Sequence, residues 1–277
     1  MNISTPTPIL FFDTETTGIL KDNKNQVSSN WDLIQLAYRK LENWEKIDKN
    51  IFINSDTKIE IWAMATHWIY PELLVEKSGW KYLSDEVREE LSPVFTENII
   101  VAHHIDFDKD VLERSGIRYW EKMIDTLKVV KVLWSEWKLL NSKWEQPEYV
   151  NLQYLRYFFE LYKITDSEGQ EECTTAHDAF WDVIVLERVF YALFDIIKTQ
   201  LSLSDEHVLE TMMRMTSKEF ILIKTMRVWK YRGQSFEEVA SLDRGYLEWI
   251  IKADFTEDIK YTCKVWLGQE EDEKFFS

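Results

Sequence analysis

The segment PILFFDTETTG, residues 8–18, ends a run of apolar residues with two acidic side chains. Asp13 follows the apolar residues directly, and Glu15 comes two positions later. Side chains two positions apart on an extended segment point to the same face, so the two carboxylates would lie side by side. Paired hard oxygen ligands suit Mg²⁺ or Mn²⁺. A solvated strand end has the same pattern, so this pair alone does not establish a metal site.

A second acidic group follows the apolar stretch Asn98–His103. Asp106, Asp108 and Asp110 stand where a helix is expected to begin. Carboxylates in the first turn of a helix are stabilised by the positive end of its dipole. Helix capping therefore accounts for at least one of the three, and the residues alone do not say which of them belongs to a site.

The third group lies in a long apolar helix expected over Ala176–Thr199. Asp182 would be costly to bury there without a partner, so it either pairs with a Lys or Arg or binds a metal ion. His177 precedes it by five positions, about 140° around a regular helix. The two share a face only if His177 lies in the first turn or in the loop before it. Asp178, four positions before Asp182, is the alternative neighbour on helix geometry.

The apolar pattern predicts the elements that carry these groups. Four segments are typical of strands: residues 9–13, 33–41, 49–54 and 98–103, with a hairpin across Glu45–Asp48. Helices are expected over residues 84–95 with Ser84 or Asp85 as N-cap, 106–116 with Gly116 as C-cap, 125–137, 151–164, 176–199 and 201–226. Three strands before the strand–helix units indicate an α/β fold with a mixed sheet, antiparallel early and parallel later.

Composition limits the classes of function. A net charge of −16 over 277 residues argues against long, non-specific contact with a duplex, but not against a small pocket in which metal ions neutralise phosphate. Cys173 and Cys263 are too few for a disulfide framework or a thiolate zinc site, and they fit a reducing cytosol. We find no signal segment and no apolar run of membrane-spanning length. The sequence predicts a cytoplasmic protein.

The three acidic motifs resemble, in order and spacing, those of DnaQ-like 3′–5′ exonucleases of the DEDDh type, which include RNase T and exodeoxyribonuclease X. The motifs are FFDTETTG, AHHIDFDKDVL and AHDAFWD, and the segments LIQLAY, AMATHWI, IDTLKV and NLQYL agree with them. The resemblance covers about residues 8–195. It implies a ribonuclease H-like fold, in which helices flank a mixed five-stranded sheet.

The resemblance assigns a role to each motif residue. The residues that match the family's metal-binding carboxylates are Asp13, Glu15, Asp108 and Asp182. They would hold two Mg²⁺ or Mn²⁺ ions, and His177 would deprotonate the attacking water. The residues that match its substrate-binding positions are Thr16, Thr17, Gly18, His104 and Phe107. One departure is His104, because the second motif usually has Asn there.

After Thr199 the composition changes, and we place a domain boundary near residue 200. Residues 1–200 would form the exonuclease domain, and residues 201–277 a helical linker with a small C-terminal module. The segment 229–251 resembles the C-terminal module of exodeoxyribonuclease X-like proteins, with Val228-Trp229 in place of the usual Phe-Gly. Its cations and aromatic residues alternate, either as a platform for single-stranded DNA or as the rim and core of the module. They are Arg227, Lys230, Arg232, Arg244, Trp229, Tyr231, Tyr246 and Trp249.

The resemblance implies a 3′–5′ exonuclease that releases nucleoside 5′-monophosphates from DNA 3′ ends. The C-terminal module favours single-stranded DNA. One alternative is an RNase T-like exoribonuclease, because the catalytic motifs do not distinguish DNA from RNA. Another is a non-catalytic nucleic-acid-binding scaffold of the same fold, against which the complete set of five catalytic residues argues. Many relatives dimerise, so the resemblance is also compatible with a homodimer.

Overall fold

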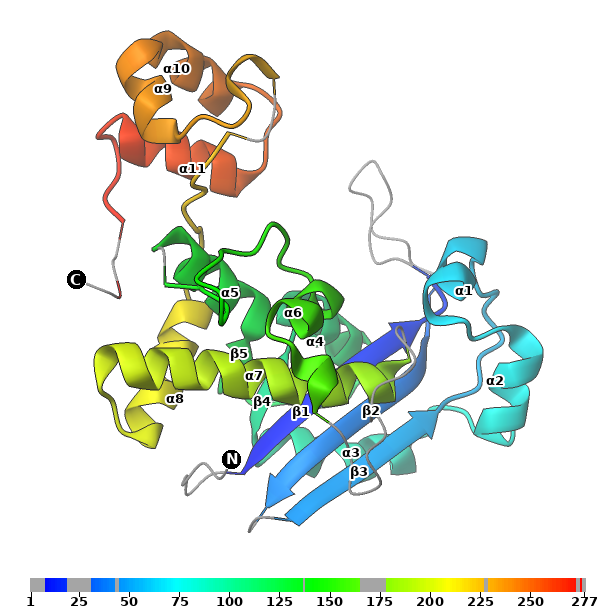
Figure 1. Cartoon of the computed structure of the whole chain (residues 1–277). Coiled ribbons are helices and arrows are strands. Elements are labelled where there is room, and N and C mark those ends of the chain that lie inside the picture. The colour runs from blue at the N-terminus through cyan, green and yellow to red at the C-terminus, as the bar shows by residue number, and fades with distance from the viewer. Residues whose placement is uncertain are drawn as a thin grey trace.

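A computed structural model describes residues 8–18, 31–42, 45–136, 138–164, 178–226, 229–272 and 275 of the chain (Figure 1). Five strands form one sheet in the order β3-β2-β1-β4-β5. The strands are β1 (Ile9–Thr16), β2 (Leu33–Glu42), β3 (Glu45–Phe52), β4 (Ile99–Ala102) and β5 (Met123–Asp125). β1 is antiparallel to β2 and parallel to β4. This confirms the predicted ribonuclease H-like class, with an antiparallel early half and a parallel later half.

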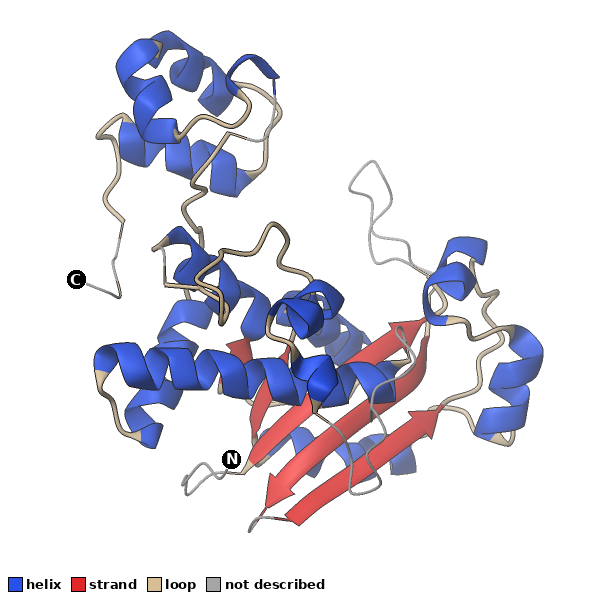
Figure 2. Ribbon diagram, viewed as in Figure 1, coloured by secondary structure: helices blue, strands red, loops and turns tan. Residues whose placement is uncertain are grey.

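Helices cover both faces of the sheet (Figure 2). In chain order they are α1 (Ile61–His67), α2 (Pro71–Ser78), α3 (Asp85–Thr96), α4 (Ile105–Arg114), α5 (Thr126–Ser135), α6 (Leu152–Phe158), α7 (Ala179–Leu201), α8 (Asp205–Thr216), α9 (Phe236–Leu242), α10 (Arg244–Lys252) and α11 (Glu257–Trp266). Short 3-10 turns lie at Leu161–Lys163 and Trp229–Tyr231. Within the described ranges, no helix has the length and apolar character that crossing a bilayer requires.

Alternating side chains of β1 enter two different cores, because successive residues of a strand face opposite sides of the sheet. Phe11 packs edge-to-face on Phe190 of α7, with ring centroids 5.2 Å apart. Phe12 packs in the same manner on Phe95 of α3, at 5.1 Å. Both residues of β1 are fully buried. The strand is therefore held from both sides, and Asp13 continues the series of side chains that faces α7.

The C-terminal residues form a separate small core. Its buried members are Met226, Phe236, Val239, Leu247, Ile250, Cys263 and Leu267. Tyr231 and Tyr246 pack against this core with ring centroids 5.1 Å apart, which agrees with the interpretation of these aromatics as core. Trp249 stacks on Tyr246 and remains partly exposed. Lys230 pairs with Asp243 at 3.0 Å and lies at the rim.

Helix α8 packs with the larger core, although the sequence placed it in a linker. Val208, Met212 and Met215 are fully buried there against α5 and α7. Ile221 is the last buried residue along the chain in that core, against which Phe275 also packs, and Met226 belongs to the small one. The division of the chain into two domains stays a prediction, and we propose that its boundary lies between these two residues rather than near residue 200.

The hairpin expected between residues 33–41 and 49–54 is confirmed, because β2 and β3 pair antiparallel. Its second strand begins earlier than predicted, at Glu45, so residues 45–48 belong to β3 and not to the turn. The first residues of β3 are polar and exposed, so no apolar pattern marks this edge strand. Helices α1 and α2 were also missed, because each is too short for a clear helical period. Ser84 is confirmed as the N-cap of α3, where its hydroxyl accepts from the Val87 N–H.

A buried ion-pair network fastens α7 to the sheet. Arg39 of β2 donates to Glu187 of α7 at 2.6 Å and to Asp48 of β3 at 2.7 Å. Lys46 contacts the same glutamate at 3.0 Å. The Glu187 side chain is only 4% exposed. Charges buried this deeply are tolerated only while they remain paired, so the network fixes the position of α7 over β2.

Replacement of Arg39 by Met should lower the free energy of unfolding by about 2–4 kcal/mol, because Glu187 keeps only the partly exposed Lys46. The double variant Arg39→Met/Glu187→Leu should recover much of this loss, since it leaves no buried unpaired charge. Urea unfolding of the single and double variants measures both effects. Losses that simply add in the double variant would contradict this account.

Candidate active site

The first two candidate carboxylates lie at the carboxyl end of β1. Asp13 is opposite Ala37 and Glu15 is opposite Gln35 of β2. Both are partly buried and share the face of the sheet that α7 covers. The intervening Thr14 points to the other face, as the pleat requires. This agrees with the prediction from the sequence that the two carboxylates share one face of the strand.

Asp108 reaches the same end of the sheet from a different element. β4 ends at Ala102, and after a short turn α4 begins at Ile105, which places Asp108 in the first turn of the helix. Because β1 and β4 are parallel neighbours, their carboxyl ends lie together. Asp108 is 3% exposed and accepts a hydrogen bond of 2.7 Å from the Thr14 hydroxyl. This bond ties the first turn of α4 to β1.

Asp182 lies in the first turn of α7. Asp178 caps this helix by accepting from the Phe180 N–H at 3.0 Å, and its carbonyl accepts from the Asp182 N–H at 3.0 Å. The side-chain amide of Gln153 on α6 donates to Asp182 at 2.5 Å. The Gln35 amide lies 3.5 Å from the Asp178 carboxylate, which connects the start of α7 to β2.

These carboxylates repel one another. Burial raises the pKa of Asp13 well above its ordinary value, and the charges of Asp108, Glu15 and Asp182 raise it further. The pKa of Glu15 is also raised well above its ordinary value, first by burial and then by Asp182 and Asp108. Burial raises the pKa of Asp108 to about 7, although the Thr14 bond opposes the shift. Residues far apart in the sequence thus bring negative charge together at a site that disfavours it.

The donor set fits a divalent cation in chemistry and charge. All four groups are carboxylates, the hard oxygen ligands that Mg²⁺ and Mn²⁺ prefer. A cation would relieve the repulsion that raises the pKa of Asp13 and Glu15. Among the described residues no three potential ligands converge on one point in the rotamers that the structure shows. Asp108 and Asp182 are turned toward Thr14 and Gln153 instead.

His177, the predicted general base, lies outside the described residues. The predicted substrate-binding segment Thr16–Gly18 is buried, and the Thr16 hydroxyl donates to the Gly18 carbonyl at 2.6 Å. The Thr17 N–H donates to Asp32, and its carbonyl accepts from the Glu60 N–H. The Thr16 carbonyl is 3.2 Å from the His67 ring. These bonds fix the segment that follows the carboxylates, and its contact with substrate stays a prediction.

His104 and Phe107 differ in exposure. Phe107 is partly buried against the core beneath α4, and His104 is exposed. The backbone of His104 is left-handed, with φ +80°, and its N–H donates to Asp125. Asn adopts this conformation more readily than other non-glycine residues, so the usual Asn of the motif suits the backbone at this position.

The neighbouring His103 is partly buried, and its ring connects two segments of the chain. Its Nε2 lies 3.0 Å from the Val150 carbonyl, and its Nδ1 lies 2.9 Å from the Thr126 hydroxyl. A carbonyl only accepts, so Nε2 carries the proton, and in the neutral ring Nδ1 is an acceptor that faces the Thr126 hydroxyl, which is also 3.1 Å from the Ala102 carbonyl. Burial lowers the pKa of His103 to about 4. His103 therefore joins the end of β4 to the loop before α6 as a neutral group.

Sequence reasoning missed the residues that hold the carboxylates. Thr14 and Gln153 carry no charge, and their partners lie 94 and 29 positions away along the chain. For Thr14 the alternation of β1 was a usable signal, because it places the hydroxyl on the face opposite Asp13. No feature of the NLQYL segment identified Gln153 as a partner of Asp182.

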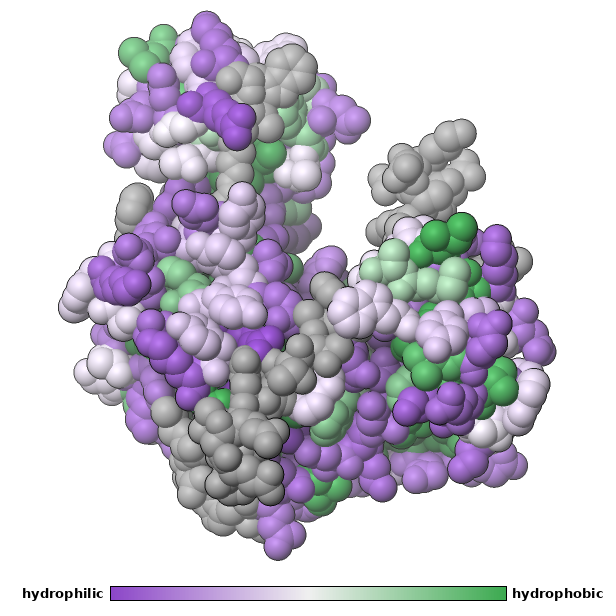
Figure 3. Space-filling view, turned by 45° about the vertical axis from the view of Figure 1, so that its right-hand side comes forward, coloured by the Kyte–Doolittle hydropathy of each residue, from purple (hydrophilic) through white to green (hydrophobic). Residues whose placement is uncertain are grey.

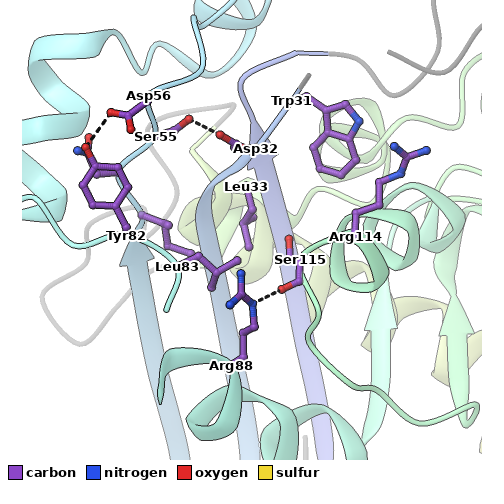
Figure 4. Close-up of a pocket in the computed structure, with 12 residues that line it drawn as sticks. Trp31, Asp32, Leu33, Ser55, Asp56, Tyr82, Leu83, Arg88, Arg114 and Ser115 are labelled. Carbon is purple, nitrogen blue, oxygen red and sulfur yellow. Dashed lines mark hydrogen bonds between the residues drawn. The ribbon is translucent and has the colours of Figure 1, made fainter. Parts of the chain in front are cut away.

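A pocket of about 280 Å³ lies away from the carboxylates, between the starts of β2 and α3 and the end of α4 (Figure 4). Its charged groups have partners. Arg88 donates to the Ser115 carbonyl at 2.8 Å, and Arg114 lies over the Trp31 ring at 5.3 Å. Asp32 accepts from Ser55 at 2.5 Å. None of the predicted catalytic residues lines this pocket.

Comparison with known families decides the class of protein. The exonuclease family model named for RNase T matches residues 10–190. The chain belongs to this exonuclease family. A second model, described as exodeoxyribonuclease X-like C-terminal, matches residues 230–254. Both matches confirm the resemblance found in the motifs. No curated protein sequence matches the chain.

Solved structures similar to this exonuclease are distant from it. Exonuclease X in complex with 5′-overhanging duplex DNA is 18% identical, with a TM-score of 0.47, over 76% of this chain and 99% of that one. Cell-death related nuclease 4 is 12% identical, with a TM-score of 0.48, over 69% and 64%. A 3′-exonuclease that recognises a histone mRNA stem-loop is 11% identical, with a TM-score of 0.44, over 71% and 66%. Likenesses this distant do not indicate a substrate.

The exonuclease should become more stable in EDTA when one charge is removed from the carboxylate cluster. At pH 8 we expect Asp13→Asn to raise the melting temperature by about 2–6 °C, because it removes a buried charge and its repulsion with the neighbouring carboxylates. The control is Asp106→Asn on α4, whose carboxylate is 61% exposed and pairs with Lys128. It should leave the melting temperature nearly unchanged. Scanning calorimetry measures the melting temperatures of both variants. A lower melting temperature for Asp13→Asn would contradict the account that the Asp13 charge destabilises the fold.

His103 should make the stability of the exonuclease depend on pH in the acid range. Its folded pKa, about 4, is below the ordinary value of 6.5, so its contribution is complete above pH 6.5 and is lost as the pH falls toward 4. The loss should approach about 3 kcal/mol. Urea unfolding between pH 4 and 7.5 measures it. In His103→Gln, which keeps a donor for the Val150 carbonyl, this loss of unfolding free energy at acid pH should disappear. Equal slopes in both proteins would exclude His103 as the cause.

Proposed function

We propose that this exonuclease is a DEDDh-type, metal-dependent enzyme that removes nucleoside 5′-monophosphates from DNA 3′ ends. The observation that carries the proposal is that burial, and then the charges of Asp108 and Asp182 from α4 and α7, raise the pKa of Asp13 and Glu15 on β1. Such a cluster lowers stability, so a chemical use for it is the simplest account.

The four carboxylates would hold two divalent ions. When bound, such ions neutralise the phosphate and stabilise the attacking and leaving oxygens of an in-line displacement. Thr14 and Gln153 each donate to one of the carboxylates and fix its orientation. His177 would take the proton of the attacking water, for which an unperturbed pKa near 6.5 is suitable at neutral pH.

The terminal nucleotide would lie against the segment after β1 and the start of α4. The residues that we expect to contact it are Thr16, Thr17, Gly18, His104 and Phe107. The exodeoxyribonuclease X-like match at residues 230–254 supports DNA over RNA as the substrate. RNA stays the alternative, because the chemistry at the carboxylates does not involve the 2′-hydroxyl. The homodimer and the cytoplasmic location also stay predictions.

Two aspartates in the same turn of α4 give a matched test. Asp108→Asn should lower the rate of hydrolysis of 3′-recessed, single-stranded and duplex DNA by at least about 100-fold, since it removes a proposed metal ligand. Asp106→Asn, two residues away and exposed, should retain nearly the wild-type rate. Asp13→Ala and Asp182→Ala should be folded and inactive, and EDTA should stop the wild-type enzyme.

The assay should follow 5′-labelled DNA and RNA of one sequence with Mg²⁺ and with Mn²⁺. Shortening of the labelled strand from its far end establishes 3′–5′ polarity, and the ratio of the two rates establishes the preferred sugar. Wild-type activity in Asp108→Asn, or equal losses in both α4 variants, would refute the site. Hydrolysis of RNA alone would leave the site in place and correct the substrate.

A further inference from the structure

Three exposed tryptophans have a backbone conformation that is unfavourable for them. The described part of the chain contains six non-glycine residues with positive φ, and three of them are Trp68, Trp80 and Trp144, at 60°, 65° and 65°. They are also the three most exposed tryptophans in that part, at 56%, 66% and 82%. A left-handed backbone disfavours any L-residue with a bulky side chain, and Gly or Asn would fit these positions better. Packing within the chain offers these indoles little compensation.

Trp144 is held at the tip of a hydrogen-bonded turn. The Asn141 side chain accepts from the Lys143 and Glu145 N–H groups at 2.9 and 3.0 Å. The Trp144 N–H donates to the Asn141 carbonyl at 3.0 Å. The same loop reaches the site through Val150, whose carbonyl accepts from His103 at the end of β4. The turn therefore presents an indole to solvent in a fixed position relative to the carboxyl end of the sheet.

Trp68 is fixed to the other side of the site. It is the left-handed C-cap of α1, with its N–H bonded to the Met64 carbonyl at 2.8 Å. The preceding His67 lies 3.2 Å from the Thr16 carbonyl, one residue beyond Glu15. In Figure 1, α1 and the loop between α5 and α6 lie on opposite sides of the carboxyl end of β1. Hydrophobic side chains gather over α1 and α2 in Figure 3.

We propose that Trp68 and Trp144 are stacking platforms for the bases of a single-stranded nucleic acid on two sides of the active site. The inference deepens the proposed function and rests on it. An acidic chain of net charge −16 gains little from phosphate contacts, which supply much of the affinity of basic nucleic-acid binders. Stacking on aromatic side chains does not require net positive charge and tolerates any base. Two fixed, exposed indoles beside the site would supply such contacts.

The test is equilibrium binding of fluorescently labelled oligothymidylate of about 12 nucleotides to the full-length protein in Ca²⁺ or EDTA, followed by anisotropy. Trp68→Ala and Trp144→Ala should each weaken binding by about five- to hundred-fold. Trp68→Phe, which keeps an aromatic ring, should retain most of the wild-type affinity. The control is Trp80→Ala, which removes an indole of the same backbone type from a turn whose Lys81 carbonyl bonds to Asn54, after β3. It should bind like the wild type.

A second substrate separates this inference from the proposed function. The 4-nitrophenyl ester of thymidine 5′-monophosphate carries no neighbouring bases, so the tryptophan variants should hydrolyse it at the wild-type rate while their KM for the oligonucleotide rises. If the wild type hydrolyses neither substrate, the proposed function fails, and anisotropy still decides the stacking. Unchanged binding in both alanine variants overturns the inference, as does an equal loss in Trp80→Ala.

The melting temperature separates a role of Trp144 in binding from a role in packing, because the two roles predict changes of opposite sign. Trp144→Gly should raise the melting temperature, because glycine accepts φ +65° without strain and the 82% exposed indole packs little. The same variant should weaken oligonucleotide binding. A lower melting temperature would show that Trp144 packs within the chain and would overturn the inference. Reduced self-association in the variants, with unchanged binding of the strand, would assign the surface to a protein partner instead.

Discussion

Repulsion among carboxylates is the constraint on which the rest of this structure depends. Burial raises the pKa of Asp13, Glu15 and Asp108, and neighbouring carboxylates raise the pKa of Asp13 and Glu15 further, so the folded chain holds these groups where their charged forms are disfavoured. The restraint comes from burial of β1 on both faces and from hydrogen bonds to the uncharged Thr14 and Gln153. Arg39 pairs with Glu187 of α7, five residues past Asp182. The ion pairs that stabilise the fold are thus different groups from the carboxylates proposed to bind metal ions.

The sequence predicted those parts of the site that depend on neighbouring residues within one strand or helix. The apolar segments of β1 and β4 and the spacing of Asp13 and Glu15 follow from alternation within one strand. The choice of Asp108 over its two acidic neighbours required the family motif, because all three suit the first turn of a helix equally well. Thr14 and Gln153 could not be recognised as partners of the carboxylates, since only the tertiary fold brings each pair together.

The misplaced start of β3 has its origin in exposure. β3 begins with polar, exposed residues at the edge of the sheet, so hydrophobic periodicity gives no sign of it. The opposite case is α8, whose composition looks like the start of a new unit although its apolar face completes the larger core. A change in composition along a chain therefore marks a domain boundary only when the segments before and after it do not pack in one core. The sequence does not show whether they do.

The position of the candidate ligands within their elements has a consequence for local opening of the chain. β1 is the central strand, paired with β2 along its length and with β4 over residues 9–11, so the amide hydrogens bonded in these ladders should exchange only when the sheet opens. Asp108 and Asp182 lie in the first turns of α4 and α7, where helices fray. Half of the carboxylate cluster is therefore carried by a strand of the sheet, and half by helix ends whose fraying is opposed by the bonds from Thr14 and Gln153. Loss of either bond should loosen the site before it loosens the fold.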